Sequence, residues 1–494
     1  MSKNLPVTIY RAAQVRELDR LAIEELGIPG YTLMYRAGEA AFRVLRRRWP
    51  RSRSLLVLCG AGNNAGDGYV LARVARSKGM NVTVAALVDP AKLSGDAQIA
   101  WETYQAAGGS VTEWQPEMLE QADVVVDAIL GTGLARTLAD KPRELVEAVN
   151  ASGADVLALD IPTGLHADTG RVMGAAIIAD MTITFVGLKL GLYSGDALNH
   201  VGKIVFDDLG IPLQLTERMH CAGRRLSESH VHETLPPRPR TTHKGQNGHV
   251  LIIGGNVGMG GAVILAGSAA LRSGAGRVSI ATRGEHVAAT ISARPELMCR
   301  GVEKPADLTA LLEAVDIVAI GPGLGTDVWA QQLLDAVLRT DKPKILDADA
   351  LNLLAAHPVK RNDWLLTPHP GEAARLIGVK TSEIQEDRFV ALARVLEKYG
   401  GTAVLKGAGS LVGHVGEAAW ICDRGNPGMA TPGMGDVLTG IIAAIAAQCG
   451  DLTAAARSGV FVHAAAGDDA ARRGERGLIA DDVLKHLATW INLS

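Results

Sequence analysis

The feature that most constrains the fold is an alternation repeated along the whole chain. Short runs rich in β-branched residues are each followed by glycines and then by a helical pattern. A strand that alternates with a helix predicts a parallel sheet, and therefore an α/β fold. The runs lie at residues 55–58, 82–87, 124–126, 156–159 and 182–186, and again at 250–253, 278–281, 317–320, 344–347, 364–367 and 402–405.

The alternation breaks at about residues 213–245, where prolines and charged residues replace the apolar periodicity. A chain of 494 residues is also too long for one ordinary core. We therefore predict two α/β domains, residues 1–220 and 221–494.

Composition narrows the class of protein. The 50 basic and 53 acidic residues give a net charge of −3, which argues against a nucleic-acid-binding protein. The amino-terminal segment lacks the apolar core of a secretory signal, and the most apolar helical stretch, residues 441–447, is too short to span a bilayer. The five cysteines show no zinc-type spacing. We expect a cytoplasmic protein that binds small molecules, interacts with neither nucleic acid nor membrane, and forms a homo-oligomer.

The first strand runs into the segment GAGNNAGDGY, residues 60–69, and residues 70–78 are predicted to form a helix. A glycine-rich turn before a helix presents backbone N–H groups to a phosphate. Such a turn also serves merely to pack a helix closely against a sheet. The added polar residues Asn63, Asn64 and Asp67 favour a binding site.

Two further strand ends carry polar residues, in VDAILGTGL (126–134) and LDIPTG (159–164). Because carboxyl ends of neighbouring parallel strands open onto one crevice, Asn64, Asp127, Asp160 and Thr163 are expected to converge. Their amide, carboxylate and hydroxyl oxygens suit a hard cation. For any single aspartate, capping of the next helix is the alternative.

GNNAGDGY, DAILGTGL and LDIPTGL resemble the three signatures of the NAD(P)HX epimerase family over residues 8–215, with Ala65 and Thr163 standing where the family usually has glycine and serine. NAD(P)HX is NADH or NADPH hydrated at nicotinamide C6. The resemblance implies a Rossmann-like three-layer domain that interconverts the R and S hydrates. It assigns a potassium ion to Asn64, Asp127 and Thr163, and contact with the substrate to Asp160 and to Asn63, Asn64, Ala65, Gly66, Asp67, Gly131, Thr132, Gly133, Leu134, Ala135, Arg136 and Thr137. Epimerising this carbon requires the hydroxyl to be lost and added again on the other face with the help of an acid/base group, and Asp160 is the candidate for that catalytic role. Lys189 also matches, although a solvated lysine at a strand exit is an equal alternative.

In the second half, NPGMATPGMGD (426–436) leads into an apolar helix expected at residues 437–447. Glycines before a helix make an anion hole for a phosphoryl group, and Asp436 at the helix start can accept a proton. Capping of the helix is the alternative role for this aspartate. The loop KGAGS (406–410) follows a strand and can hold an adenosine phosphate, although a plain tight turn explains it equally well. No Walker A motif is present.

KGAGS and GMGD together resemble the ribokinase-like superfamily. With HKGxxGHVLIIGG, GPGLG, DADALNLL and TPHPGEAARL, residues 241–490 resemble the ADP-dependent NAD(P)HX dehydratases, with Gln246 and Pro432 departing from the usual aspartate and glycine. The resemblance implies a ribokinase-like α/β domain in which ADP phosphorylates the C6 hydroxyl of the S hydrate, and phosphate then leaves. It assigns the catalytic base to Asp436, Mg²⁺ to the phosphates, the hydrate to Ala262, Gly323 and His369, and the nucleotide to Lys406, Gly407, Ala408, Gly409, Ser410 and Gly435.

One alternative remains open. A ribokinase-like kinase of a small alcohol, fused to a non-catalytic Rossmann-like binding module, would share GMGD and the anion hole. Such a kinase yields a stable phosphorylated product, whereas coenzyme repair yields free phosphate and a restored nicotinamide ring. The presence of Asn64, Asp127 and Asp160 favours a catalytic front domain.

Overall fold

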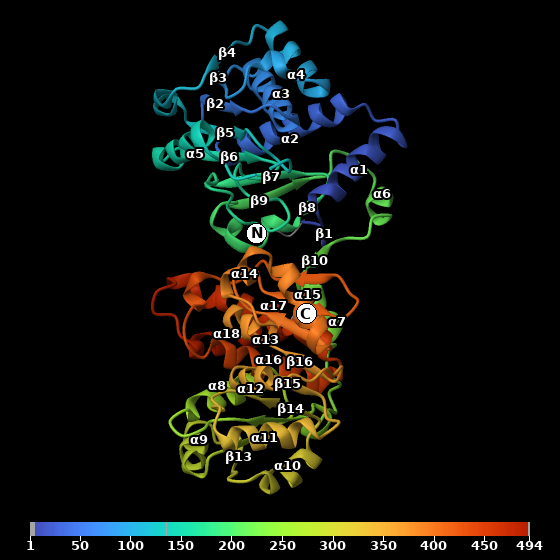
Figure 1. Cartoon of the computed structure of the whole chain (residues 1–494), viewed down its shortest axis with the longest axis vertical. Helices are drawn as coiled ribbons and strands as arrows, with labels where there is room; N and C mark the ends of the chain where they lie inside the picture. The colour runs from blue at the N-terminus through green and yellow to red at the C-terminus, as the bar shows by residue number, and fades with distance from the viewer. Residues whose placement is uncertain (1–4, 135, 493–494) are drawn as a thin grey trace. The chain divides into compact units, whose positions relative to one another are not determined.

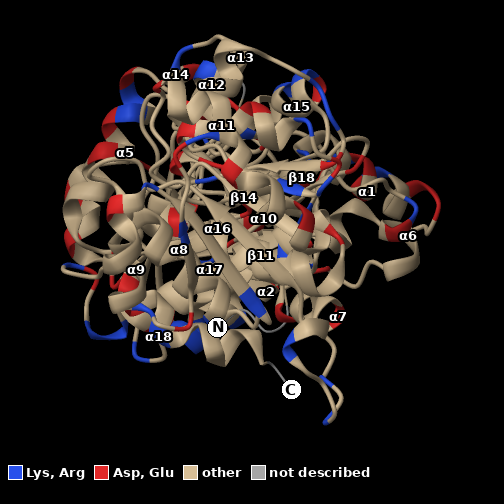
Figure 2. Cartoon of the chain, turned by 90° about the horizontal axis from the view of Figure 1, so that it is seen from below, with Lys and Arg blue, Asp and Glu red and all other residues tan. Residues whose placement is uncertain are grey.

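The computed structural model describes residues 5–134 and 136–492. The chain divides into two compact units, Met1–Gly223 and Arg224–Ser494, each with its own core (Figure 1). Acidic and basic residues alternate along the helices and loops, as Figure 2 shows, in keeping with the small net charge. Among the described residues, no helix has both the length and the apolar character needed to cross a membrane.

The front unit contains a parallel sheet in the order β4-β3-β2-β5-β6-β7-β9. The order reverses between β2 and β5, which is the switch point where ligands bind in Rossmann-like folds. The predicted front strands and the α/β class are therefore confirmed. The strands are β2 (Ser54–Cys59), β3 (Asn81–Ala86), β4 (Val111–Glu113), β5 (Val124–Ala128), β6 (Asp155–Leu159), β7 (Met181–Phe185) and β9 (Lys203–Asp207).

Helices cover both faces of this sheet, giving three layers. Leu55 and Val57 of β2 pack in one buried cluster with α2 and α3, whereas Leu56 and Leu58 pack in a second cluster with α5. Apolar residues at consecutive positions thus serve two faces, as expected for a parallel strand buried on both sides. The helices are α1 (Ala12–Glu24), α2 (Gly30–Arg48), α3 (Asn63–Ser77), α4 (Gly95–Ala106), α5 (Asp140–Ser152) and α6 (Leu213–Glu217). A separate parallel pair joins β1 (Thr8–Tyr10) to β8 (Leu188–Lys189).

The predicted start of α3 was wrong. The helix begins at Asn63 rather than at residue 70, directly after Gly62 in an extended conformation. Glycines weaken helix propensity, but here close packing overrides it: a Cβ on Gly66 would lie 2.4 Å from the Met34 sulfur. The polar residues of GNNAGDGY therefore occupy the first turns of a helix rather than a loop.

The back unit is built on a sheet whose strands run in the order β13-β12-β11-β14-β15-β16-β17-β18-β19. Pairing is parallel as far as β17, and the hairpin of β17, β18 and β19 is antiparallel. The predicted strands of this half are confirmed, whereas β13, β18 and β19 were not predicted. The strands are β11 (His249–Ile253), β12 (Arg277–Thr282), β13 (Met298–Gly301), β14 (Ile317–Ile320), β15 (Lys344–Leu346), β16 (Trp364–Leu366), β17 (Thr402–Leu405), β18 (Leu411–His414) and β19 (Ala419–Ile421), while β10 (Gly223–Arg225) spans the boundary of the units.

The core of the back unit centres on α16, which begins at Met434 and ends at Cys449. Its apolar residues are buried against α8 and α17, which confirms the predicted buried helix and places Asp436 in its first turn. The helices are α7 (Glu228–Thr234), α8 (Gly260–Arg272), α9 (Val287–Ala293), α10 (Thr309–Ala314), α11 (Val328–Leu338), α12 (Asp349–Ala356), α13 (Pro370–Ile377), α14 (Thr381–Glu386), α15 (Arg388–Tyr399), α16, α17 (Leu452–Ala470) and α18 (Ala480–Ile491).

Candidate active sites

A cavity of about 490 Å³ opens at the carboxyl ends of β2, β5 and β6, the switch point of the front sheet. Only some of the predicted residues line it. Ala65 and Gly66 are buried on the helix side and, like Leu134, Arg136 and Thr137, are not among its described lining residues, while Ala135 lies outside the described residues. The predicted residues that line the cavity are Asn63, Asn64, Asp67, Gly131, Thr132, Gly133 and Asp160.

Asp160 is held in a strained conformation directly after β6. Its φ of 65° lies in the left-handed region, which residues other than glycine seldom adopt. The Lys189 ammonium donates hydrogen bonds to Asp160 Oδ1, to Thr184 Oγ1 at 2.9 Å and to the Phe185 carbonyl at 2.9 Å. With 1% of its side chain exposed, Lys189 is not the solvated lysine that the sequence left open. The two residues form a buried ion pair that faces the cavity.

Asp127 and Thr163 are joined beneath this cavity. The Thr163 N–H donates to Asp127 Oδ2 and the Thr163 hydroxyl to Oδ1, both at 2.7 Å. Burial raises the pKa of Asp127 to about 6, against the opposing effect of the Thr163 hydrogen bonds. Such a buried carboxyl gains from a nearby positive charge.

Asn64 completes the predicted cation set. Both polar atoms of its side-chain amide are buried, and neither has a hydrogen-bond partner among the described residues. A Cβ on Gly131 would lie 3.5 Å from the Asn64 side-chain carbon, so the amide lies against the loop that follows β5. An unsatisfied buried oxygen fits an absent ligand. The amide, carboxylate and hydroxyl oxygens of Asn64, Asp127 and Thr163 are ligands of the kind that hard cations prefer.

In the back unit, Asp436 lies in the first turn of α16, after Gly433 with a φ of 88°. Burial raises the pKa of Asp436 to about 7; the carboxyl groups of Asp347 and Asp349 raise it further, and Lys406 opposes them. A carboxyl with this pKa exchanges a proton near neutral pH, as a general base must.

Lys406 is positioned differently from the simple loop ammonium that the sequence suggested. Its Nζ donates to Asp347 Oδ1 at 2.7 Å and lies 3.8 Å from a Glu372 oxygen. A Cβ on Gly435 would lie 3.3 Å from this Nζ, so glycine allows the ammonium to approach the start of α16. Lys406 therefore reaches the neighbourhood of Asp436 through a buried ion pair.

The segment KGAGS forms the turn of the hairpin between β17 and β18, with positive φ at Gly407 and Gly409. The buried Arg388 guanidinium donates to the carbonyls of Leu405, Lys406 and Gly409 at 3.2 to 3.4 Å. Ser410 closes the turn through a 2.8 Å bond to the Gly407 carbonyl.

The residues predicted to bind the hydrate are partly assembled. A Cβ on Gly323 would lie 3.1 Å from that of Ala262, so these two positions adjoin. His369 caps α13, accepts a hydrogen bond from Gly371 N–H at 3.0 Å and has a half-exposed side chain. Burial and the Lys406 charge lower the pKa of His369.

Comparisons with known proteins match both halves of the chain. A family profile described as YjeF-related protein N-terminus matches residues 30–191, and one described as NAD(P)H-hydrate dehydratase matches residues 250–489. The bifunctional NAD(P)H-hydrate repair enzyme of Coxiella burnetii is 48% identical over 98% of this chain and 99% of its own length. The chain belongs to the bifunctional NAD(P)H-hydrate repair enzyme family.

Other members and structures agree with this family. The repair enzyme of Escherichia coli is 45% identical over 100% of this chain and 96% of its own length. A ribokinase-like superfamily protein from Enterococcus faecalis is 32% identical, with a TM-score of 0.52, over 55% of this chain and 96% of its own. This likeness confirms the ribokinase-like fold of the back unit. Because the family match covers both halves of the chain, the alternative of a kinase fused to a non-catalytic binding module is not favoured.

Several residues at the sites of this family member were missed from sequence. Asp19 and Arg16 of α1 line the front cavity, more than 40 residues before the first motif. Asp19 lies four residues after Val15 on the buried stripe of α1, and a carboxyl on an apolar stripe was the available signal. Arg388 and Thr439, whose hydroxyl donates a hydrogen bond to Asp347 Oδ2 at 2.7 Å, belong to no recognised motif, so only the folded chain reveals them.

Proposed function

We propose that the chain repairs hydrated nicotinamide coenzymes. Residues 1–220 would interconvert the R and S hydrates of NADH and NADPH, and residues 221–494 would dehydrate the S form with ADP, giving NAD(P)H, AMP and phosphate. The proposal rests chiefly on Asn64 and Asp160, two of the predicted strand-end residues, which line one cavity in a chain that also carries the Asp436 site. Spontaneous hydration gives both epimers, and the dehydratase accepts only the S form. An epimerase that converts R to S therefore allows both hydrates to be repaired.

In the front unit, Asp160 acts as the acid/base group. Inversion at C6 requires the hydroxyl to be lost and added again on the other face. The ion pair with Lys189 fixes the Asp160 carboxyl at the cavity wall. Asn63 and the glycine loop of residues 131–133 line the same cavity and contact the substrate.

In the back unit, Asp436 takes the proton of the C6 hydroxyl as its oxygen attacks the terminal phosphorus of ADP. Hydroxide is a poor leaving group and phosphate a good one. Loss of phosphate from C6, together with a proton from C5, then forms the C5=C6 double bond and restores the reduced ring. The start of α16 offers N–H groups to the phosphoryl group in transit. The KGAGS turn and Lys406 hold the nucleotide, and Mg²⁺ accompanies its phosphates.

We further propose that Asn64, Asp127 and Thr163 bind a potassium ion. The unpartnered amide and the buried carboxyl support it. When N-methylglucamine replaces potassium, epimerisation is expected to slow at least about 10-fold, because no cation then holds the loop after β5 in place. Sodium is expected to restore part of the rate. The rate of R and S exchange measures this. An Asp127→Asn chain should lose the response to potassium, and retention of the full response would contradict the assignment.

One experiment tests the repair function as a whole. Mixed hydrate epimers are incubated with the full chain and ADP, and recovery of the absorbance of the reduced ring is followed. The wild-type chain is expected to recover nearly all of the coenzyme, whereas Asp160→Asn should stop after the S fraction because the R fraction is no longer converted. A stable phosphorylated product in place of free phosphate would contradict the proposal.

A further inference from the structure

Four carboxyl groups and two cationic side chains line the front cavity, the latter being Arg16 and Lys189. Three of the carboxyls and one ammonium influence one another electrostatically: Asp19 of α1, Asp67 of α3, Asp160 after β6 and Lys189 of β8. Only Asp160 forms an ion pair with the ammonium. A site that needed nothing but one acid/base group would not require the other two carboxyls.

Asp19 and Asp67 have no structural partner to explain them. Within residues 5–134 and 136–492, the side chain of neither residue makes a hydrogen bond or an ion pair. Both side chains are half-buried at the cavity wall, where an ionised carboxyl without a partner is disfavoured. The cost falls when the carboxyl holds a proton.

The surroundings of the two carboxyls favour the protonated form. Burial raises the pKa of Asp67 well above its usual range, and the nearby Asp160 and Asp19 raise it further, while Lys189 opposes them. Burial raises the pKa of Asp19 to about 6, with Lys189 opposing and Asp160 adding to the rise. Asp67 is therefore the acid of the set, while Asp160 lies beside the Lys189 ammonium.

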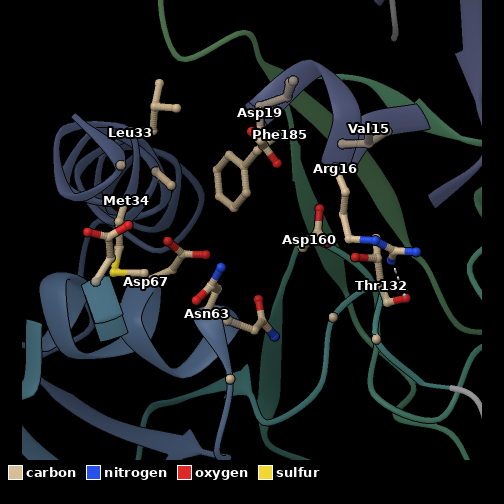
Figure 3. Close-up of a pocket in the computed structure, with 18 of the residues that line it drawn as sticks. Val15, Arg16, Asp19, Leu33, Met34, Asn63, Asp67, Thr132, Asp160 and Phe185 are labelled. Atoms are coloured by element: carbon tan, nitrogen blue, oxygen red, sulfur yellow. Dashed lines mark hydrogen bonds between the residues drawn. The ribbon is translucent and has the colours of Figure 1, made fainter. Parts of the chain in front are cut away.

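The two groups lie on opposite sides of the cavity. In Figure 3, Asp67 extends from the helix on one side toward the open space, and Asp160 lies across that space. Asp19 reaches in from α1, beside Phe185. A flat ring placed between α3 and the end of β6 would have one carboxyl on each face.

We propose that Asp67 is a second catalytic residue of the epimerase, acting on the face of the nicotinamide ring opposite to Asp160, and that Asp19 is a positioning residue that keeps the proton on Asp67. This inference rests on the proposed epimerase function. Pairs of carboxyls whose surroundings differ in this way commonly divide the acid and base roles.

The steps balance as follows. The Asp67 carboxylic acid gives its proton to the C6 hydroxyl as the C–O bond breaks, water leaves, and the ring nitrogen lone pair forms a cationic C=N bond. A second water adds to C6 on the other face, and its proton passes to Asp160. One water is lost and one gained, the proton has moved from Asp67 to Asp160, and the opposite epimerisation runs these steps backwards. Proton exchange with solvent then returns a proton to Asp67 and removes one from Asp160.

The rate of epimerisation should therefore show an alkaline limb in its pH dependence. The charged groups facing Asp67 are Asp160, Lys189, Asp19 and Arg16, with Asp96 of α4 also bordering the cavity. The rate falls at high pH as Asp67 loses its proton. Because the Asp19 carboxyl raises the pKa of Asp67, Asp19→Asn should move this alkaline limb to lower pH.

The test uses the full chain and the purified S hydrate without nucleotide, so that only the exchange of epimers is measured. Asp67→Asn is expected to lower kcat/KM at least about 100-fold, the usual contribution of a general acid. Asp67→Glu should restore part of the loss, and Asp19→Asn should shift the alkaline limb. Glu102→Gln, an exposed change on α4, serves as the matched control and should behave as wild type.

The outcomes separate this inference from the function on which it depends. If the wild-type chain does not exchange the epimers, the epimerase function itself fails. If wild type exchanges them and Asp67→Asn stays within twofold of it, only the role of Asp67 is overturned. If thermal unfolding shows that Asp67→Asn has lost the folded front unit, the pH profiles of epimerisation for Asp67→Glu and Asp19→Asn are compared with that of wild type. An alkaline limb at the wild-type pH in both variants would overturn the proposal.

Discussion

Asp436→Asn is expected to lower the ADP-dependent recovery of NADH from the S hydrate by about 1,000-fold and to leave the exchange of epimers unchanged. The carboxyl is the proposed acceptor for the hydroxyl proton, and an amide of the same size cannot accept it. The measurement is single-turnover recovery of the ring absorbance, with the exchange of epimers in the same sample as the control. Recovery within 10-fold of wild type would remove Asp436 from the role of base.

The pH dependence gives an independent check on this residue. A general base works in its ionised form, and the pKa of Asp436 is about 7, so kcat/KM for dehydration should rise with pH up to about 7 and level off above it. The same shift affects stability. Because the folded chain holds this proton more tightly than the unfolded chain, stability is lost as pH rises from about 4 through 7. Asp436→Asn should therefore unfold at a higher temperature than wild type at pH 8, which separates lost chemistry from lost folding.

The second large effect is expected for Lys189→Met. This change leaves the Asp160 carboxyl, 17% exposed, without its ammonium, and removal of one partner of a buried ion pair costs about 3–5 kcal/mol. The front unit should unfold at lower denaturant concentration, and epimerisation should fall below detection. Lys141→Met is the control, because Lys141 is 87% exposed and should tolerate the change.

A double variant distinguishes the two consequences of that loss. In Lys189→Met with Asp160→Asn, no unpaired charge remains at the end of β6, so most of the stability should return while epimerisation stays absent. Denaturant unfolding and the exchange assay are measured on the same preparation. If the double variant is no more stable than Lys189→Met alone, the cost does not come from the stranded Asp160 charge.

Much of the fold could be predicted from the sequence, because each parallel strand is buried on both faces and is therefore a continuous apolar run. The polar residues after β2, β5 and β6 were equally readable, since sheet topology alone brings strand ends together. The start of α3 was not, because the packing of Gly66 against Met34 outweighs the low helix propensity of glycine.

The partners of the site residues were harder to predict. Lys189 lies far along the chain from the first motif, and nothing local shows that its ammonium turns inward to Asp160. Asp347 belongs to a recognised motif, yet its contact with Lys406 joins β15 to the hairpin only in the folded chain. Long-range pairing of charges therefore completes both sites, whereas the sequence pattern predicts only their location.

The position of Arg388 has a consequence for what the KGAGS turn offers to a ligand. A guanidinium beneath the turn attracts the negative ends of its peptide dipoles, so three carbonyl oxygens point toward the interior. A turn that would otherwise present a mixture of oxygens and N–H groups is thereby biased toward anions. If the turn holds the nucleotide as proposed, Arg388 would favour its phosphates from the opposite side of the turn, without contacting the nucleotide.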